Sequence, residues 1–159
     1  MSTPSLTLRP VQPEDLEVFY LNNKDPEAVW MAAFTAKDPA DREAFDAHWA
    51  RIMKSDTVII RTIVFNHEIA GSVLKYEMEG EAEVSYWIGR PFWGQGIATA
   101  ALQQFIDELE FRPLHARAAA DNLGSIRVLE KCGFTRTGTD RYFANARNEE
   151  IEEVIYILE

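Results

Sequence analysis

The chain has 159 residues, a formal net charge of −10, and 47% hydrophobic and 26% charged residues. This length and composition predict one globular domain over residues 1–159, and the acidity disfavours nucleic-acid binding, which needs basic surface. No apolar run reaches membrane-spanning length, and residues 1–5 lack the basic and apolar regions of a secretion signal. The single cysteine, Cys132, excludes an internal disulfide. These features predict a cytoplasmic protein without membrane or nucleic-acid partners.

The first third of the chain predicts one strand and two helices. Residues 6–9 alternate between apolar and polar side chains, whereas residues 13–23 and 39–54 repeat apolar side chains at helical spacing. Asp38 is the expected N-cap of the second helix, and residues 28–35 are apolar without a clear period. The expected apolar stripes are Leu16, Phe19 and Tyr20 in the first helix and Phe45, Trp49, Ile52 and Met53 in the second.

The rest of the chain predicts a block of strands followed by alternating helices and strands. Residues 57–65, 69–78 and 81–89 read as an antiparallel meander, because the turns between them are too short for crossover connections. After these strands, a helix, a strand, a helix and two strands are expected at 96–110, 114–120, 122–131, 134–143 and 150–158. The predicted fold class is α+β, a mixed and mostly antiparallel sheet of about seven strands flanked by about four helices.

The stretch from Arg90 to Leu102 joins a predicted strand to a predicted helix and carries Gly94 and Gly96. Glycine tolerates positive φ, so loop amides can face a ligand closely. The first amides of a helix have no intrahelical acceptor and carry partial positive charge. The stretch therefore predicts a site for a phosphate or pyrophosphate. A tight turn is the alternative interpretation, since the spacing matches neither the dinucleotide fingerprint nor the P-loop.

A second motif follows at residues 121–134, with Asn122, Ser125 and the run from Glu130 to Phe134. Together with the Trp-Gly-x-Gly-x-Ala loop at 93–98, it resembles the Gcn5-related N-acetyltransferase (GNAT) superfamily. Within that superfamily it is similar to the ribosomal-protein N-acetyltransferase branch. The resemblance covers nearly the whole chain. It implies a single GNAT-like domain in which acetyl-CoA lies between two parallel strands that splay apart, here 81–89 and 114–120.

The resemblance also assigns residues to the cofactor. The backbone of Trp87 and Ile88 is expected to pair with the pantetheine arm, and Asn122 to hydrogen-bond it, although Asn122 also suits an N-cap. Ser125 is expected near the sulfur, with an ordinary first-turn serine as the alternative. The amides expected to hold the pyrophosphate are those of Gly94, Gln95, Gly96, Ile97, Ala98 and Thr99.

Two residues are the predicted catalytic groups. Glu83 shares a strand face with Ser85 and Trp87, and it is expected to act as the base, because only a neutral amine attacks. A surface carboxylate on the strand is the alternative interpretation of Glu83. Ser125, or a water molecule, would serve the departing thiolate, since Leu129 occupies the position where many family members carry a tyrosine.

The resemblance implies an N-acetyltransferase that moves the acetyl group of acetyl-CoA to a primary amine by direct attack in a ternary complex. The acceptor is a protein N-terminus or a small-molecule amine, and a homodimer is expected. Trp30, Met31 and Phe34 either line the acceptor pocket or pack in the core. No metal is expected, because the three histidines lack metal-ligand spacing. Two alternatives are a non-catalytic acyl-CoA-binding regulatory module, which Leu129 keeps open, and an unrelated nucleotide-phosphate binder.

Overall fold

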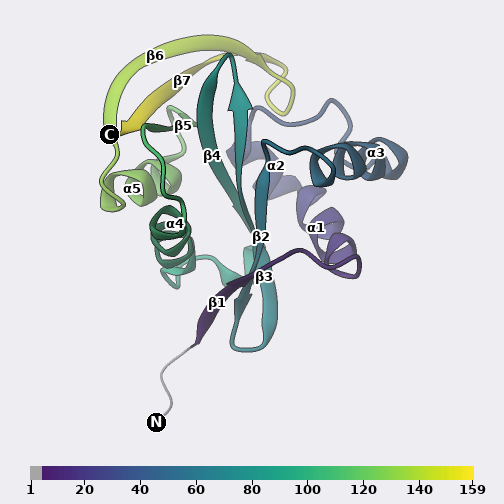
Figure 1. Ribbon diagram of the computed structural model, residues 1–159. Helices are drawn as coiled ribbons and strands as arrows, with labels where there is room; N and C mark the ends of the chain where they lie inside the picture. The colour runs from purple at the N-terminus through teal and green to yellow at the C-terminus, as the bar shows by residue number, and fades with distance from the viewer. Residues whose placement is uncertain (1–4) are drawn as a thin grey trace.

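One seven-stranded sheet runs through residues 5–159, the part of the chain that the computed structural model describes (Figure 1). The strand order is β1-β2-β3-β4-β5-β7-β6. Among these neighbours, β4 and β5 are parallel and the other pairs are antiparallel. The strands are β1 (Leu6–Arg9), β2 (Ile59–Phe65), β3 (Glu68–Met78), β4 (Glu81–Ile88), β5 (Leu114–Ala119), β6 (Thr135–Ala144) and β7 (Glu149–Leu158).

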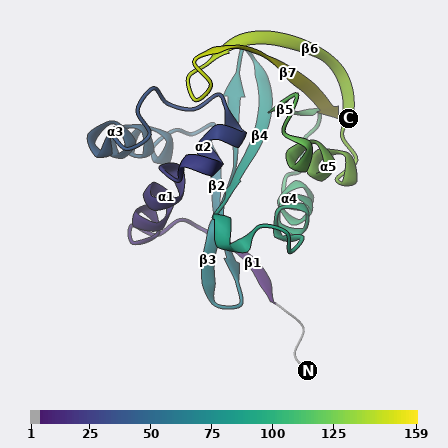
Figure 2. The ribbon, with the colours of Figure 1, turned by 180° about the vertical axis from the view of Figure 1, so that it is seen from behind.

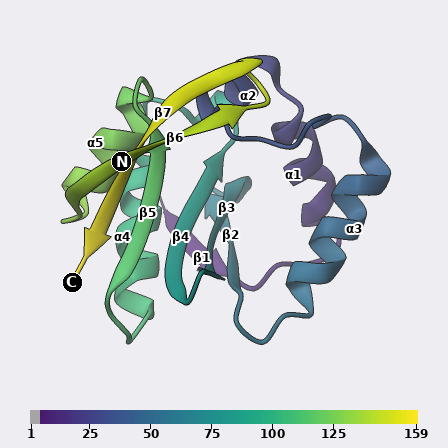
Figure 3. The same cartoon turned by 90° about the horizontal axis from the view of Figure 1, so that it is seen from above.

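Helices cover both faces of this sheet. Figure 3 shows α4 and α5 on one side, and α1, α2 and α3 on the other; Figure 2 gives the view from behind. The helices are α1 (Asp15–Asn23), α2 (Pro26–Ala32), α3 (Arg42–Met53), α4 (Ile97–Glu108) and α5 (Leu123–Lys131), with a short 3-10 turn, η1, at Arg90–Phe92. The predicted α+β class, the number of strands and the parallel pair at the centre are confirmed.

The helices differ from the prediction in two places. An additional helix, α2, forms in the apolar segment without a clear period, because two turns are too short to show one. Asp25 caps it by accepting a hydrogen bond from the amide of Glu27. The N-cap of α3 is Asp41 rather than Asp38, since Asp41 accepts from the amide of Ala44 at 3.1 Å. Met53, at the end of α3, is 46% exposed and lies outside the buried stripe.

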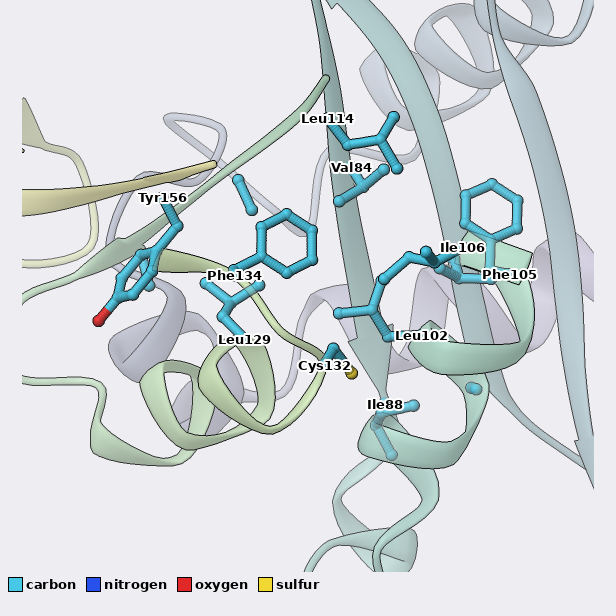
Figure 4. Close-up of a cluster of buried hydrophobic side chains, with 14 of the residues drawn as sticks. Val84, Ile88, Leu102, Phe105, Ile106, Leu114, Leu129, Cys132, Phe134 and Tyr156 are labelled. Atoms are coloured by element: carbon cyan, nitrogen blue, oxygen red, sulfur yellow. The ribbon is translucent and has the colours of Figure 1, made fainter. Parts of the chain in front are cut away.

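The main core lies between the sheet and helices α4 and α5 (Figure 4). Leu102 and Phe105 of α4 are fully buried, because their spacing places both on the helix face that meets the sheet. Val84 and Ile88 of β4 meet this helix from the sheet side. A second core joins α1 and α3 to the opposite face of the sheet; it contains Phe19, Phe45, Trp49 and Ile60. Each such side chain contributes about 1.5–3 kcal/mol through burial.

Two strands at the centre of the sheet separate. Within residues 5–159, β4 and β5 pair at one position, Glu83 with His115, near the start of both strands. β4 stays paired with β3 along its whole length, up to Ile88 opposite Gly71. Gly71 permits this close approach, because a Cβ there would lie 1.9 Å from the carbonyl oxygen of Trp87. The carboxyl half of β4 therefore keeps unpaired backbone groups on the side that faces β5.

Candidate active site

A cavity of about 60 Å³ lies where β4 and β5 separate. Its lining comes from both strands and from α4 and α5, and Figure 4 shows three of the lining side chains, Val84, Leu102 and Leu129. Aliphatic groups dominate, with hydroxyls and free strand backbone beside them, so the cavity suits an extended and mostly apolar chain with amide groups. The lining residues are Val84, Ser85, Tyr86, Leu102, Ala116, Arg117, Ser125 and Leu129.

The glycine loop ends at the N-terminus of α4. Gly94 and Gly96 both have φ of 76°, and the space that a Cβ would occupy at either position is open. Within residues 5–159, the amides of residues 94–99 donate to no side chain, and to no backbone oxygen outside the helix. Trp93 anchors the loop, because its indole N–H donates to the carbonyl of Ile88 at 2.8 Å. The loop thus offers free donors at a helix N-terminus, as an anion site requires.

Tyr86 is a site residue that the sequence interpretation missed. Its hydroxyl lies 2.7 Å from Oγ of Ser125. This contact joins β4 to α5, and both residues line the cavity. Burial raises the pKa of Tyr86, and the contact with Ser125 opposes that rise only in part. The phenol therefore stays protonated near neutral pH and can donate a hydrogen bond. Strand alternation correctly placed Tyr86 on the face opposite Glu83, but could not show that Ser125 covers that face.

Asn122 is the N-cap of α5. Its Oδ1 accepts from the amide of Ser125 at 3.2 Å, and its Nδ2 donates to the carbonyl of Met31 at 3.3 Å. The capping role is thus present, and the same amide ties α5 to α2. The contact that we predicted between Asn122 and the pantetheine arm stays a prediction, as do the contacts from the backbone of Trp87 and Ile88.

Glu83 lies on the other face of β4, in a buried cluster of charges. The residue as a whole is 1% exposed, which rules out a surface carboxylate. Its Oε1 accepts from Nε of Arg117 at 3.0 Å, and another nitrogen of Arg117 donates to Glu153 at 3.2 Å. Oε2 of Glu83 has no hydrogen-bond partner among residues 5–159. Burial raises the pKa of Glu83, and the pairing with Arg117 only partly counteracts it.

The segment that carries Trp30, Met31 and Phe34 lies beside the loop between β6 and β7. Arg147, in the loop between β6 and β7, binds both carboxylate oxygens of Asp121 and donates to the carbonyl of Trp30. Its guanidinium also stacks over the Trp30 ring at 4.4 Å from the ring centre. Trp30 is 54% exposed, so core packing does not explain it. Phe34 meets Tyr142 of β6 edge-on, at 6.5 Å between ring centres.

Other charged and polar groups near the loop have structural partners. Arg90 pairs with Asp25 and Glu27, which attaches the loop to α2. The thiol of Cys132 is buried, donates to the carbonyl of Thr99, and has a pKa that burial raises. Among residues 5–159, no group of three or more His, Cys, Asp or Glu side chains is arranged to hold a metal ion. In the same range, no helix combines the length and the apolar character needed to cross a bilayer.

Comparisons with known proteins agree with this geometry. The family model "Acetyltransferase (GNAT) domain" matches residues 5–135. The chain is 27% identical to the uncharacterised N-acetyltransferase p20 of Bacillus licheniformis, over 98% of this chain and 93% of p20. It is 28% identical to YdaF, a candidate ribosomal N-acetyltransferase of Bacillus subtilis strain 168, over 86% of this chain and 81% of YdaF.

A solved structure extends the likeness in fold. RimL, a ribosomal-protein alpha-N-acetyltransferase solved in complex with coenzyme A, superimposes with a TM-score of 0.81 at 19% identity. The match covers 96% of this chain and 93% of RimL. The resemblance read from the glycine loop and from residues 121–134 is thereby confirmed, and this chain is an acetyltransferase that belongs to the GNAT family.

Proposed function

We propose that this protein transfers the acetyl group of acetyl-CoA to the primary amine of an acceptor, with a protein N-terminus as the first acceptor class. One observation carries the proposal: α4, which lines the cavity between β4 and β5 through Leu102, begins at a loop whose six amides have no acceptor in the described part of the chain. The cavity fits a thioester arm, and the loop fits a diphosphate. The names of YdaF and RimL support the acceptor class.

The residues of the glycine loop fit the diphosphate. The positive φ of Gly94 and Gly96 and the open space beside them allow an anion to approach the loop amides, and the α4 dipole favours negative charge there. This local arrangement would hold an anion against the net charge of −10 of the whole chain. The pantetheine arm would run along the free edge of β4, with Trp87 and Ile88 supplying backbone hydrogen bonds. Asn122 and Ser125 would meet it from α5.

The arrangement of the site favours direct transfer. Tyr86 and Ser125 lie on the sheet face covered by α4 and α5, whereas Glu83 projects from the opposite face of the same strand. Acetyl-CoA would occupy the first side and the acceptor the second, so both substrates can be bound at once. Cys132, the single cysteine, is buried and has a raised pKa, which does not favour a covalent acetyl-enzyme.

The proposed roles follow from the protons involved. Oε2 of Glu83 would take a proton from the acceptor ammonium, directly or through a water molecule. The acceptor nitrogen then forms a C–N bond to the acetyl carbon while the C–S bond breaks, and the second proton that the nitrogen loses neutralises the departing thiolate through water. A backbone N–H of Trp87 or Ile88 would stabilise the charge on the acetyl oxygen, a contribution of roughly 3–4 kcal/mol in comparable sites. The hydroxyl of Ser125, held by Tyr86, would donate to the departing sulfur.

The acceptor side has features that suit a cationic amine. Trp30 of α2 and Tyr142 of the β6–β7 hairpin are exposed aromatic rings, and the buried cluster around Glu83 carries two carboxylates for one guanidinium. A small-molecule amine would use the same charge but fewer of the rings. Peptides and small amines therefore differ in the contacts that each would make. A homodimer is part of the same proposal, and sedimentation of the purified protein tests it.

Release of free thiol from acetyl-CoA tests the function across a panel of peptides with free N-termini, polyamines and aminoglycosides. We expect turnover with at least one class of amine, and binding of coenzyme A by calorimetry. Binding without turnover of any amine would favour the regulatory module, and ATP competing equally with coenzyme A would favour a nucleotide site. Leu129 no longer favours the regulatory module, because Tyr86 and Ser125 supply hydroxyls at the cavity.

A further inference from the structure

The guanidinium of Arg117 donates hydrogen bonds to two acidic side chains on different strands. Nε donates to Oε1 of Glu83 on β4 at 3.0 Å, and Nη1 donates to Oε1 of Glu153 on β7 at 3.2 Å. The side chains of Glu83, Glu153 and Arg117 are 2%, 12% and 20% exposed, so water screens the three charges weakly. The cluster therefore holds two carboxylates and one cation at the point where β4 and β5 are still paired.

We infer that Arg117 is a positioning residue that holds one oxygen of Glu83 and leaves the other for the acceptor, while Glu153 competes for the same guanidinium. The inference deepens the proposed function and rests on Glu83 as the base. Three contacts carry it: the bond from Nε to Oε1, the bond from Nη1 to Glu153, and the absence of a partner for Oε2 among residues 5–159.

The reason lies in the charge that a buried base needs. A guanidinium devoted to Glu83 alone would stabilise the carboxylate and lower its pKa, which makes a weak base. Without any cation, burial would keep Glu83 protonated and unable to accept. A shared guanidinium gives an intermediate state, in which Glu83 can be ionised and still accept a proton. Glu153 is thus as necessary to the behaviour of Glu83 as Arg117 is.

Other titratable groups face this cluster and act on the pKa values of its members. Burial raises the pKa of Tyr76, which the carboxylates of Glu83 and Glu153 raise further, so this phenol stays neutral. His115 and Glu81 lie beside Glu83 with opposing effects on its pKa. Asp140 of β6 raises the pKa of Glu153. Each of these groups remains in the variants below, so their effects are common to all.

The test uses the full chain and two variants. One strengthens the pairing of the Arg117 guanidinium with Glu83, and the other removes that guanidinium. Glu153→Gln removes the competing charge but keeps an oxygen that can accept from Arg117. Arg117→Gln removes the cation and keeps N–H donors. The matched control is Glu152→Gln, because Glu152 is the neighbour of Glu153 on β7, half-exposed, and outside the cluster. The pKa of Glu83 is measured by carbon NMR of the side-chain carboxyl, and the pH profile of kcat with a competent amine is recorded in parallel.

We expect Glu153→Gln to lower the pKa of Glu83 and to move the acid limb of the kcat profile down by roughly one pH unit. Arg117→Gln should raise the pKa of Glu83 and the position of the acid limb by at least about one pH unit. Glu152→Gln should change neither the pKa nor the limb. A pKa of Glu83 that is the same in wild type and Glu153→Gln overturns the inference. If Arg117→Gln does not fold, Glu153→Gln carries the test alone.

Failure of the inference can be told from failure of the proposed function. If Glu83→Gln keeps full turnover, the base assignment is wrong whatever the NMR titration shows. Suppose that Glu83→Gln loses turnover, but Glu83 titrates in the Glu153→Gln variant as it does in wild type. Then Glu83 is still the base, and the positioning role of Arg117 is wrong. A purely structural role for Arg117 predicts lower stability with an acid limb that does not move.

Discussion

The hydroxyl of Tyr86 on β4 lies 2.7 Å from Oγ of Ser125 on α5, although the two residues are 39 positions apart in the chain. The contact closes one side of the cavity between β4 and β5. The Ser125 hydroxyl has one hydrogen to donate. If Tyr86 donates to Ser125 Oγ, that hydrogen remains available to a group in the cavity. In that arrangement the pair would act as a directed donor rather than as two separate polar side chains.

Tyr86→Phe tests this donor. We expect kcat to fall about five- to tenfold, since the Ser125 hydroxyl loses the hydrogen bond that orients it toward the departing sulfur, with the KM for acetyl-CoA unchanged. The pKa of the thiol of bound coenzyme A, followed by thiolate absorbance, should rise. Ser125→Ala should have a similar effect, and the double variant should be no worse than the single ones. Additive losses, or an equal loss in Tyr20→Phe on the remote helix α1, would refute the pairing.

Gly96→Val tests the anion loop. Valine at φ of 76° is strained, and its side chain fills the space before the α4 amides, so we expect the KM for acetyl-CoA to rise at least about tenfold. The matched control is Gly138→Val. Gly138 also has open space around its Cβ position, but lies in β6 without positive φ. Equal KM values for the two variants would remove the loop from the cofactor site.

Glu83→Gln tests the base. Burial raises the pKa of Glu83, and the ionised form is the active one, so activity rises with pH through a limb that lies above the ordinary glutamate value of 4.5. The variant should lose about 100-fold in kcat near neutral pH and should lack that limb. Kinetics across the pH range measure both. Glu152→Gln, on β7, half-exposed and outside the buried charge cluster, is the control and should keep the wild-type profile.

Arg147→Ala tests the acceptor wall. Removing the guanidinium breaks its bonds to Asp121 and Trp30 and so loosens the contact between the β6–β7 loop and α2. We expect the KM for the acceptor to rise about tenfold, equivalent to one charged hydrogen bond, while the KM for acetyl-CoA stays constant. Arg141→Ala on β6 is the control, since that side chain is exposed and contacts only its own hairpin. A change in the KM for acetyl-CoA alone would show that this loop does not form part of the acceptor site.

Asp15→Asn tests stability. Asp15 is fully buried and accepts from Arg9, Thr62 and the amide of Gln12. Burial alone would raise its pKa, but these donors outweigh burial and lower the pKa below the ordinary 3.8. The stabilisation is therefore full above the unfolded-state value and is lost as the pH falls through the folded-state one.

We expect the free energy of unfolding of Asp15→Asn to be lower by about 3 kcal/mol near neutral pH. The difference from wild type should shrink as the pH falls below about 4. Denaturant titrations at several pH values measure it. Asp46→Asn, which breaks an exposed pair with Arg42, should cost less than about 1 kcal/mol. A loss in Asp15→Asn that does not depend on pH would show that the charge of Asp15 is not the cause.

The elements that sequence periodicity predicted well are those with long patterns. The apolar stripe of α4 and the alternation of β4 each extend over several repeats, so element type followed directly. The alternative reading of Asn122 as an N-cap is confirmed, because a cap depends on neighbours in sequence. α2 escaped prediction because seven residues hold fewer than two complete repeats. The N-cap of α3 was misplaced because Asp38 and Asp41 both have the side chain that a cap requires.

The amino-acid sequence by itself determined the glycine loop before α4, the order of the helices and strands other than α2, and the family, because these depend on residues that are close along the chain. The contacts from Tyr86 to Ser125 and from Arg117 to Glu83 and Glu153 were decided only by the tertiary structure. Partners in such pairs come from different strands and helices, and strand alternation states which face a side chain takes but not what covers that face. Whether Glu83 is buried or exposed depended on the packing of three separate strands around it.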